Sequence, residues 1–397
     1  MRRALILALL TSLSVPAFAQ TEPGEGQNVV VTGTRIQDFR DRLAACLARN
    51  CPTNEDVDAT LALAAALFLN GDYAEGRSAV RASVGRNRDQ ARGYPEPVSD
   101  LYRATTRFAR HIGLDREART SSFEILNALQ AGVPREDHRH FTARLEIAEV
   151  QMMSGNFLGA RRELERLTRS ARAAGREDVA IIAELRDRWY ALIANPQSDA
   201  MSELIQWSRR TEPRERMRAT GARIVLARIA RSVGDSERAD ALLAEIGRSG
   251  DGSRRRLIHA PSYTLAQQAV RQGEDNDRLV TSYAYTLSRT LADHMDDSWI
   301  DVGFWIIPEG RVSGVEILRQ GADTSWARPL LDAIGGRIYS AGSEASYRLE
   351  RYTLTAGFET TTGSRLLHRS PAARVEYLDL TVNEPEARDA QGRTPPG

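Results

Sequence analysis

Lysine is absent from this chain of 397 residues, so all 54 of its basic side chains are arginines. Without lysine the chain cannot form a phosphate-binding loop that ends in a lysine, a Schiff base with a carbonyl substrate, or a Ser–Lys nucleophile pair. Arginine does not replace lysine in these roles, because its guanidinium stays protonated and cannot act as a base. Composition alone therefore excludes these classes of enzyme mechanism.

Other signals of catalysis are missing as well. The chain has no Gly-x-Ser-x-Gly, His-Glu-x-x-His or glycine-rich phosphate-loop sequence. Its six histidines are scattered, and the closest two, His138 and His140, would point to different faces of a helix. The net charge is +1, so no overall field favours nucleic acid or anionic lipid. We therefore expect a protein that is not an enzyme, with no cofactor, no metal site and no nucleic-acid partner.

Cysteine is almost absent, since Cys46 and Cys51 are the only two in the chain. On an unbroken helix they would lie about 8 Å apart, too far to form a disulfide. Pro52 disfavours the helical conformation at Cys51, so one helix is expected to end at Asn50–Pro52 before the next begins. The two sulfurs can then meet. A disulfide is favoured in an oxidising compartment; two buried thiols and a metal site, which no nearby histidine would complete, are the alternatives.

Apolar runs long enough to span a membrane are lacking, and the apolar run at the start of the chain is short. Two arginines precede an apolar run over residues 4–10, and the small residues Ala17 and Ala19 stand just ahead of Gln20. This pattern predicts a cleavable secretory signal over residues 1–19. A membrane anchor is the alternative, but a membrane span needs about 20 apolar residues. We expect the mature protein to begin at Gln20 in the periplasm, with no membrane span.

Polar segments without structural periodicity are expected at both ends of the mature chain, over residues 20–36 and 383–397. From residue 37 to about residue 250, Ala and Leu recur at helical spacing. Within this region a helix repeatedly ends at a glycine, which suits a helix C-cap, and a second helix with small and apolar residues follows. The glycines are Gly71, Gly113, Gly155 and Gly234. The pattern predicts an array of helical hairpins over 37–250.

The hairpin signature resembles the tetratricopeptide repeat. Its closest copy runs through Leu61–Leu67 to Gly71-Asp72-Tyr73, and a later copy keeps Phe157 and Ala160. Gly76 departs from the small alanine that the repeat usually has there, and the copies are separated by irregular insertions. The resemblance implies stacked hairpins with a concave face for a partner. A generic helical bundle is the alternative.

After the helical region the hydrophobic period changes to two, which is typical of strands. Ile300, Val302, Phe304 and Ile306 would share one face of a first strand. An earlier short strand is expected at Leu257–Pro261, and after the first strand a turn at Pro308–Gly310 leads to a strand at Val312–Leu318. A helix follows, with Trp326, Leu330 and Ile334 on one face. Two more strands are expected at Tyr347–Phe358 and Arg374–Thr381. This order predicts a small α+β domain over 257–382, a helix packed on an antiparallel sheet. The fold class is therefore mainly α, with this domain at its C-terminal end.

The C-terminal segment resembles the C-terminal domain of the energy transducer TonB. The likeness rests on Asp301–Phe304, Pro308–Val312, Val315–Leu318 and Arg337–Tyr339. Ser340 departs from the proline usual in that family, and no Pro-rich spacer precedes the domain. The resemblance implies the fold and peptide binding rather than energy transduction. The whole chain is similar to periplasmic tetratricopeptide proteins.

A segment near the mature N-terminus resembles the TonB box of TonB-dependent outer-membrane receptors. It consists of Val29, Val30, Val31, Thr32, Gly33, Thr34 and Arg35. A short β-prone segment with no such role is the alternative. In the TonB family the third strand of the domain lies at a sheet edge and pairs with such a segment.

The resemblance places the peptide-binding edge of this chain on the strand Tyr347–Phe358, at Arg351, Tyr352, Thr353, Leu354 and Thr355. An unpaired strand edge offers backbone donors and acceptors to an incoming strand. We therefore expect a non-catalytic adaptor that binds a protein or peptide, with Val29–Arg35 as a plug that competes for the edge. The resemblance implies a TonB-dependent receptor as the partner. The alternative hypothesis is a scaffold for an envelope complex, in which the C-terminal domain only caps the repeats.

Overall fold

The structure is a computed structural model, and it describes residues 35–248, 257–261, 263, 298–322, 324–360 and 367–381. The predicted signal at 1–19, the segment Val29–Thr34 and the predicted tail at 383–397 lie outside the described residues. The predicted change from helices to strands, between residues 250 and 257, also lies outside them.

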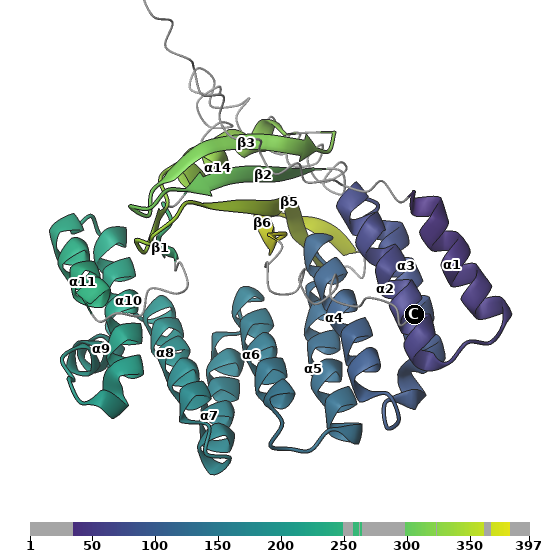
Figure 1. Cartoon of the computed structure of the whole chain (residues 1–397), viewed down its shortest axis with the longest axis horizontal. Helices are drawn as coiled ribbons and strands as arrows, with labels where there is room; N and C mark the ends of the chain where they lie inside the picture. The colour runs from purple at the N-terminus through teal and green to yellow at the C-terminus, as the bar shows by residue number, and fades with distance from the viewer. Residues whose placement is uncertain are drawn as a thin grey trace, which may run out of the picture. The chain divides into compact units, whose positions relative to one another are not determined.

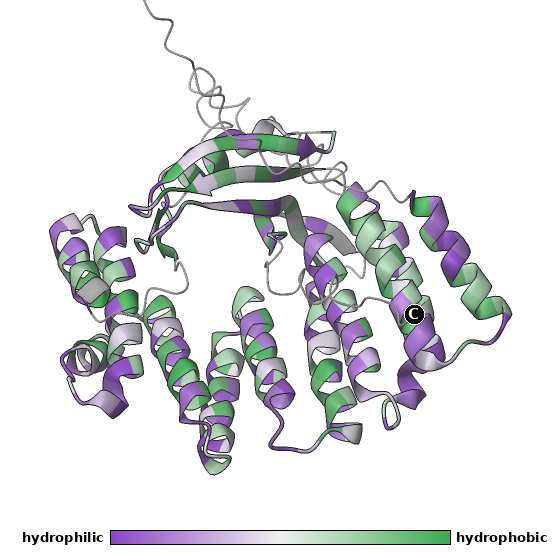
Figure 2. Ribbon diagram, in the orientation of Figure 1, coloured by the Kyte–Doolittle hydropathy of each residue, from purple (hydrophilic) through white to green (hydrophobic). Residues whose placement is uncertain are grey.

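The described residues are mainly helical, and the helices follow one another in antiparallel pairs (Figure 1). They are α1 (Ile36–Ala48), α2 (Thr53–Asn70), α3 (Tyr73–Asn87), α4 (Pro95–His111), α5 (Asp115–Gly132), α6 (His138–Met153), α7 (Phe157–Ala173), α8 (Glu177–Ala194), α9 (Ala200–Ser208), α10 (Arg216–Ser232) and α11 (Ser236–Arg248). Figure 2 shows hydrophobic and hydrophilic residues side by side around most of these helices, as expected for helices that bury one face.

The four predicted glycine turns are confirmed as helix ends. Gly71, Gly113, Gly155 and Gly234 each follow the last turn of a helix and have φ between +74° and +90°. At the first of them, the N–H groups of Gly71 and Asp72 donate to carbonyls in the last turn of α2. These bonds satisfy carbonyls that the helix itself leaves unpaired. The chain can then reverse and begin α3 within two residues.

Leucine and alanine fill the interior between the helices. Leu67, Leu164 and Leu167 have no surface exposed to solvent, and burial of a side chain of this size stabilises the fold by about 1.5–3 kcal/mol relative to exposure. Gly76, where the sequence departs from the repeat pattern, lies against the ring of Phe108. A Cβ at this position would be 2.4 Å from Phe108 Cζ, so the aromatic ring occupies the space that an alanine would need.

The strands of the C-terminal region form one four-stranded antiparallel sheet and a separate short pair. The order in the larger sheet is β3 (Val312–Gln320), β2 (Trp299–Ile306), β5 (Ser346–Thr360) and β6 (Leu367–Asp379). The pair consists of β1 (Leu257–His259) and β4 (Ile338–Tyr339). The helix α14 (Arg328–Gly335) covers one face of the larger sheet (Figure 1).

The predicted faces of the first strand and of the helix are confirmed. Ile300, Val302, Phe304 and Ile306 are fully buried in one cluster with Trp326, Leu330 and Ile334. Alternate residues of a strand point to opposite faces of a sheet, so this cluster defines the face of the sheet beneath α14. The opposite face of β2 carries Trp299 and Asp301, which pack on the helical array.

Within the part of the chain that the structure describes, no helix has the length and the apolar character that a membrane crossing requires.

Candidate functional site

A buried ion pair joins the sheet to the first hairpin of the array. Asp301 in β2 and Arg351 in β5 are both without solvent exposure, and Arg351 Nη2 donates to Asp301 Oδ2 at 3.0 Å. The same guanidinium donates to the carbonyls of Phe68 and Leu69 at the end of α2, each at 2.8 Å. Trp299 covers it, with 3.8 Å from the Arg351 Cζ to the ring centroid. Burial alone would lower the pKa of Arg351. The hydrogen bonds to Asp301 and the negative charge of Asp301 outweigh burial and raise the pKa of Arg351.

Hydroxyl and imidazole groups continue this contact. The Oγ1 of Thr353 lies 3.1 Å from the hydroxyl of Tyr73 and 2.9 Å from Nδ1 of His111. His111 is buried, and burial, followed by the positive charge of Arg110, holds its pKa well below the usual range. The imidazole is therefore neutral at physiological pH and acts as part of the packing between α4 and the sheet.

The last strand adds a second group of ion pairs to the array. Glu376 is buried, and its carboxylate accepts from Arg110 of α4 and from Arg374 of its own strand. Arg110 Nη2 and Arg374 Nε each lie 2.9 Å from a carboxylate oxygen. Arg374 also donates to Asp115 at the start of α5, with Nη1 3.2 Å from Oδ2. The even-numbered side chains of β6 thus face the array.

The prediction that Tyr347–Phe358 is an edge strand is wrong. This segment lies in β5, which pairs with β2 on one side and with β6 on the other. Arg351, Thr353 and Thr355 are buried against the array, and Tyr352 and Leu354 are buried on the α14 face. The physical reason is the added strand β6, which takes up the backbone groups that the TonB resemblance leaves free for a partner.

β6 is instead the outer strand on this side of the sheet, and β3 is the outer strand on the other side. The N–H of Leu380 donates to the carbonyl of Leu349, and bonded and non-bonded pairs alternate along an antiparallel ladder. The even-numbered residues of β6 therefore bond to β5, and the odd-numbered ones direct their N–H and C=O groups outward. In the described part of the chain, no strand pairs with this outer side. The outward residues in regular register are Ala373, Val375, Tyr377 and Asp379.

A cavity of about 290 Å3 with charged and apolar lining residues lies beside the end of β6, on the face of the sheet that meets the array. Side chains from α4, α6 and β6 line it, among them Arg103, Arg107, Arg110, Glu146, Glu149 and Tyr377. Arg103 Nε lies 3.1 Å from both carboxylate oxygens of Glu146. Arg110 pairs with Glu376 and approaches Glu149 at 3.7 Å. Two of the three arginines are thus neutralised by carboxylates.

The third arginine, Arg107, is different. Among the described residues, none accepts a hydrogen bond from its guanidinium or forms an ion pair with it. The side chain of Arg107 lines the cavity and is exposed to solvent there. Desolvation lowers the pKa of Arg107. The negative charge of Glu146 raises this pKa, the positive charge of Arg110 lowers it, and the net shift is downward. Arg107 therefore places a positive charge without a partner inside the cavity.

A second cavity, of about 320 Å3, lies on the opposite, α14 face of the same sheet. Tyrosines line much of it, together with apolar side chains, and its lining includes Tyr263, Tyr339, Tyr352, Tyr377, Leu330 and Val375. The buried Glu350 is held there by Arg337 at 2.7 Å. Burial and the charge of Glu350 raise the pKa of Tyr377, so its hydroxyl stays protonated. Tyr377 lines both cavities.

Sequence reasoning missed this site. The only local signal is the spacing of Arg103, Arg107 and Arg110, which places three arginines on one side of a helix. The tyrosines and β6 come from segments far apart in the chain, so no motif connects them.

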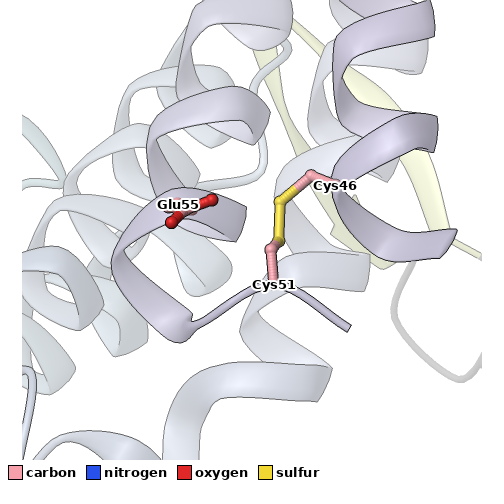
Figure 3. A group of neighbouring side chains, drawn as sticks. All are labelled: Cys46, Cys51 and Glu55. Atoms are coloured by element: carbon pink, nitrogen blue, oxygen red, sulfur yellow. A yellow bond between two sulfur atoms is a disulfide. The ribbon is translucent and has the colours of Figure 1, made fainter. Parts of the chain in front are cut away.

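The two cysteines form a disulfide in the structure, with 5.2 Å between their Cα atoms. Cys46 belongs to α1, and Cys51 lies in the turn before α2, as the sequence indicated. Figure 3 shows Glu55 next to them, and its carboxylate and the two sulfurs lie within 4.8 Å of one another. Thiolates bind metals, so these groups would offer metal ligands only after reduction of the disulfide.

Comparisons with known proteins add little to this geometry. No protein-family model matches the chain, and no curated protein matches it. Among solved structures, it is similar to BtubC (BKLC) from P. vanneervenii, at 14% sequence identity and a TM-score of 0.40, over 58% of this chain and 95% of that one. This likeness is too distant to carry an argument about function.

Proposed function

We propose that the protein is a non-catalytic periplasmic adaptor that binds an extended segment of a partner protein. The observation that carries the proposal is the outer side of β6, with which no described strand pairs and which is bordered by a cavity on each face of the sheet. A strand edge of this kind binds an incoming strand through backbone hydrogen bonds, and adjacent cavities select its side chains.

The sequence resemblances support the same proposal. A tetratricopeptide-like array and a TonB-like sheet both belong to proteins that bind peptides, and a TonB-dependent outer-membrane receptor is the partner class that they indicate. We propose that β6, rather than β5, receives the partner strand. The TonB-box-like segment Val29–Arg35 is then an internal competitor for the edge of β6.

A peptide with the sequence of Val29–Arg35 tests the proposal. We expect it to bind the protein, as measured by fluorescence anisotropy, and to bind more tightly when residues 20–36 are deleted. Tyr377→Pro removes an outward N–H without removing a bond to β5, so the peptide should bind at least about tenfold more weakly. Tyr377→Val, which keeps the N–H, is the matched control. Equal binding by the two variants would contradict strand addition at β6.

A scaffold with the sheet as a structural cap is the second candidate. The observation that favours it is the buried Arg351, which pairs with Asp301 and donates to the carbonyls of Phe68 and Leu69. If no extended peptide binds the protein with or without residues 20–36, the scaffold function replaces the adaptor function.

A further inference from the structure

The two cavities beside β6 lie on opposite faces of the sheet and meet at Tyr377. Neighbouring side chains of an extended segment also point to opposite faces. We infer that the partner segment carries an acidic side chain directly next to an aromatic or large apolar one. The acidic group enters the cavity with Arg107, and the apolar group enters the tyrosine-lined cavity. The inference rests on the proposed binding of a strand at β6 and adds the chemistry of that strand.

The charge balance of the first cavity defines the acidic position. Glu146 is neutralised by Arg103, and Glu149 lies near Arg110. Arg107 has no partner among the described residues and remains open to solvent. A carboxylate brought there by a partner strand completes an ion pair in the cavity, and the bound strand excludes water from the pair, which makes it stronger than at an open surface.

The lining of the second cavity defines the apolar position. Leu330 and Val375 supply aliphatic surface, and four tyrosines supply aromatic rings. Tyr352 and Tyr377 lie with their ring centroids 5.6 Å apart, a spacing at which aromatic rings attract one another. The charged groups there are already paired, Arg337 with Glu350 and Arg348 with Asp379. An aromatic side chain therefore gains contact area in this cavity without leaving a charge unpaired.

The geometry also defines the spacing of the two side chains. Two residues next to each other point into different cavities, whereas two residues separated by one position point to the same face. When one position separates the acidic and the apolar residue, both side chains point to the same face, so only one of them can enter the cavity that suits it. A slip of the strand along β6 by one residue exchanges the faces but does not repair the mismatch.

The test uses the full chain and two synthetic peptides with a background of Ser and Thr. In one peptide a Glu is next to a Phe, and in the other a single Thr separates them, so composition and net charge are the same. We expect the first peptide to bind about tenfold more tightly. Equal affinity of the two peptides overturns the inference, because the alternation between faces would then have no effect.

A protein variant identifies the acidic cavity. Arg107→Gln should weaken binding of the Glu–Phe peptide about tenfold, and the loss should vanish when Gln replaces Glu in the peptide, as in a double-mutant cycle. Arg162→Gln changes the net charge by the same amount on the exposed surface of α7, outside both cavities, and should leave the affinity unchanged.

The possible results separate the inference from the proposed function. Binding that depends on the outward N–H of Tyr377 but not on Arg107 overturns the inference and leaves the adaptor function in place. Binding that Arg162→Gln weakens as much as Arg107→Gln points to net charge alone and also overturns the inference. Absence of binding by both peptides and by the Val29–Arg35 peptide overturns the inference and the adaptor function together.

Discussion

Arg351 Nη1 donates a 2.8 Å hydrogen bond to the carbonyl oxygen of Phe68, 283 positions earlier in the chain. That carbonyl lies in the last turn of α2, where it also accepts from the N–H of Gly71 just after the helix. The last strands of the chain thus complete the first hairpin of the array, and the ring of Trp299 shields the contact from water. The sheet and the array are therefore parts of one packing unit at this point.

We expect Arg351→Met to lower the free energy of unfolding by about 3–5 kcal/mol, because it leaves Asp301 buried without its main partner. Arg319 also approaches Asp301, at 2.6 Å, but from a half-exposed position. Urea denaturation measures the loss. The double variant Asp301→Asn with Arg351→Met should recover part of it, and a double variant as unstable as the sum of the single ones would contradict this account.

Alanine variants of Gly113 and Gly155 distinguish the cost of a positive φ from the cost of a clash with the sheet. Gly113 has φ +77°, and a Cβ there would lie 1.9 Å from the carbonyl oxygen of Ala356 in β5. Gly155 has nearly the same φ, +74°, with nothing within 4 Å of a Cβ. Both alanine variants bear the cost of positive φ, about 1–2 kcal/mol. We expect Gly113→Ala to be clearly less stable than Gly155→Ala in thermal unfolding; equal losses would show that the sheet does not press on this turn.

His111 should make stability depend on pH. Its folded-state pKa is depressed by burial and by nearby arginines, Arg110 first. The unfolded chain therefore takes up a proton near pH 6.5 that the folded chain does not, and the contribution of His111 is present above about pH 6.5 and lost as the pH falls below it. The slope approaches about 1.4 kcal/mol per pH unit. His111→Asn, which does not titrate, is the control, and parallel urea-stability profiles of the two proteins from about pH 7.5 to pH 5 would refute the prediction.

The Cys46–Cys51 disulfide closes a very small loop. Its contribution to stability should therefore be at the low end of about 2–4 kcal/mol. We expect alkylation without reductant to label neither cysteine in native or denatured protein, as measured by intact mass, and reduction to lower the unfolding temperature only slightly. Two labels on unreduced protein would show that the bond is absent in solution.

The N-terminus of the exported protein is a further expected outcome of the sequence pattern. Intact-mass measurement should find a chain that begins at Gln20. Soluble protein that retains residues 1–19 would contradict the predicted signal.

Local patterns predicted much of the fold. The glycines at 71, 113, 155 and 234 identified helix ends, because a positive φ there is a local requirement that few residues other than glycine meet. The alternation from Ile300 to Ile306 identified the buried face of β2. The stretch Asn50–Pro52 identified the break between α1 and α2 that lets Cys46 and Cys51 meet.

The sequence by itself thus determined several elements of this protein: the helix ends at four glycines, the buried face of β2, and that no lysine chemistry is possible. Only the tertiary structure decided how the strands are ordered. The segment that ends in Asp379 was expected to form a strand, but nothing local indicates that it pairs with β5 and covers the edge at Arg351. Pairing order depends on contacts between distant segments, such as Glu376 with Arg110 and Arg374 with Asp115. The same long-range packing leaves Arg107 beside the new edge without a partner among the described residues, which no spacing along the chain reveals.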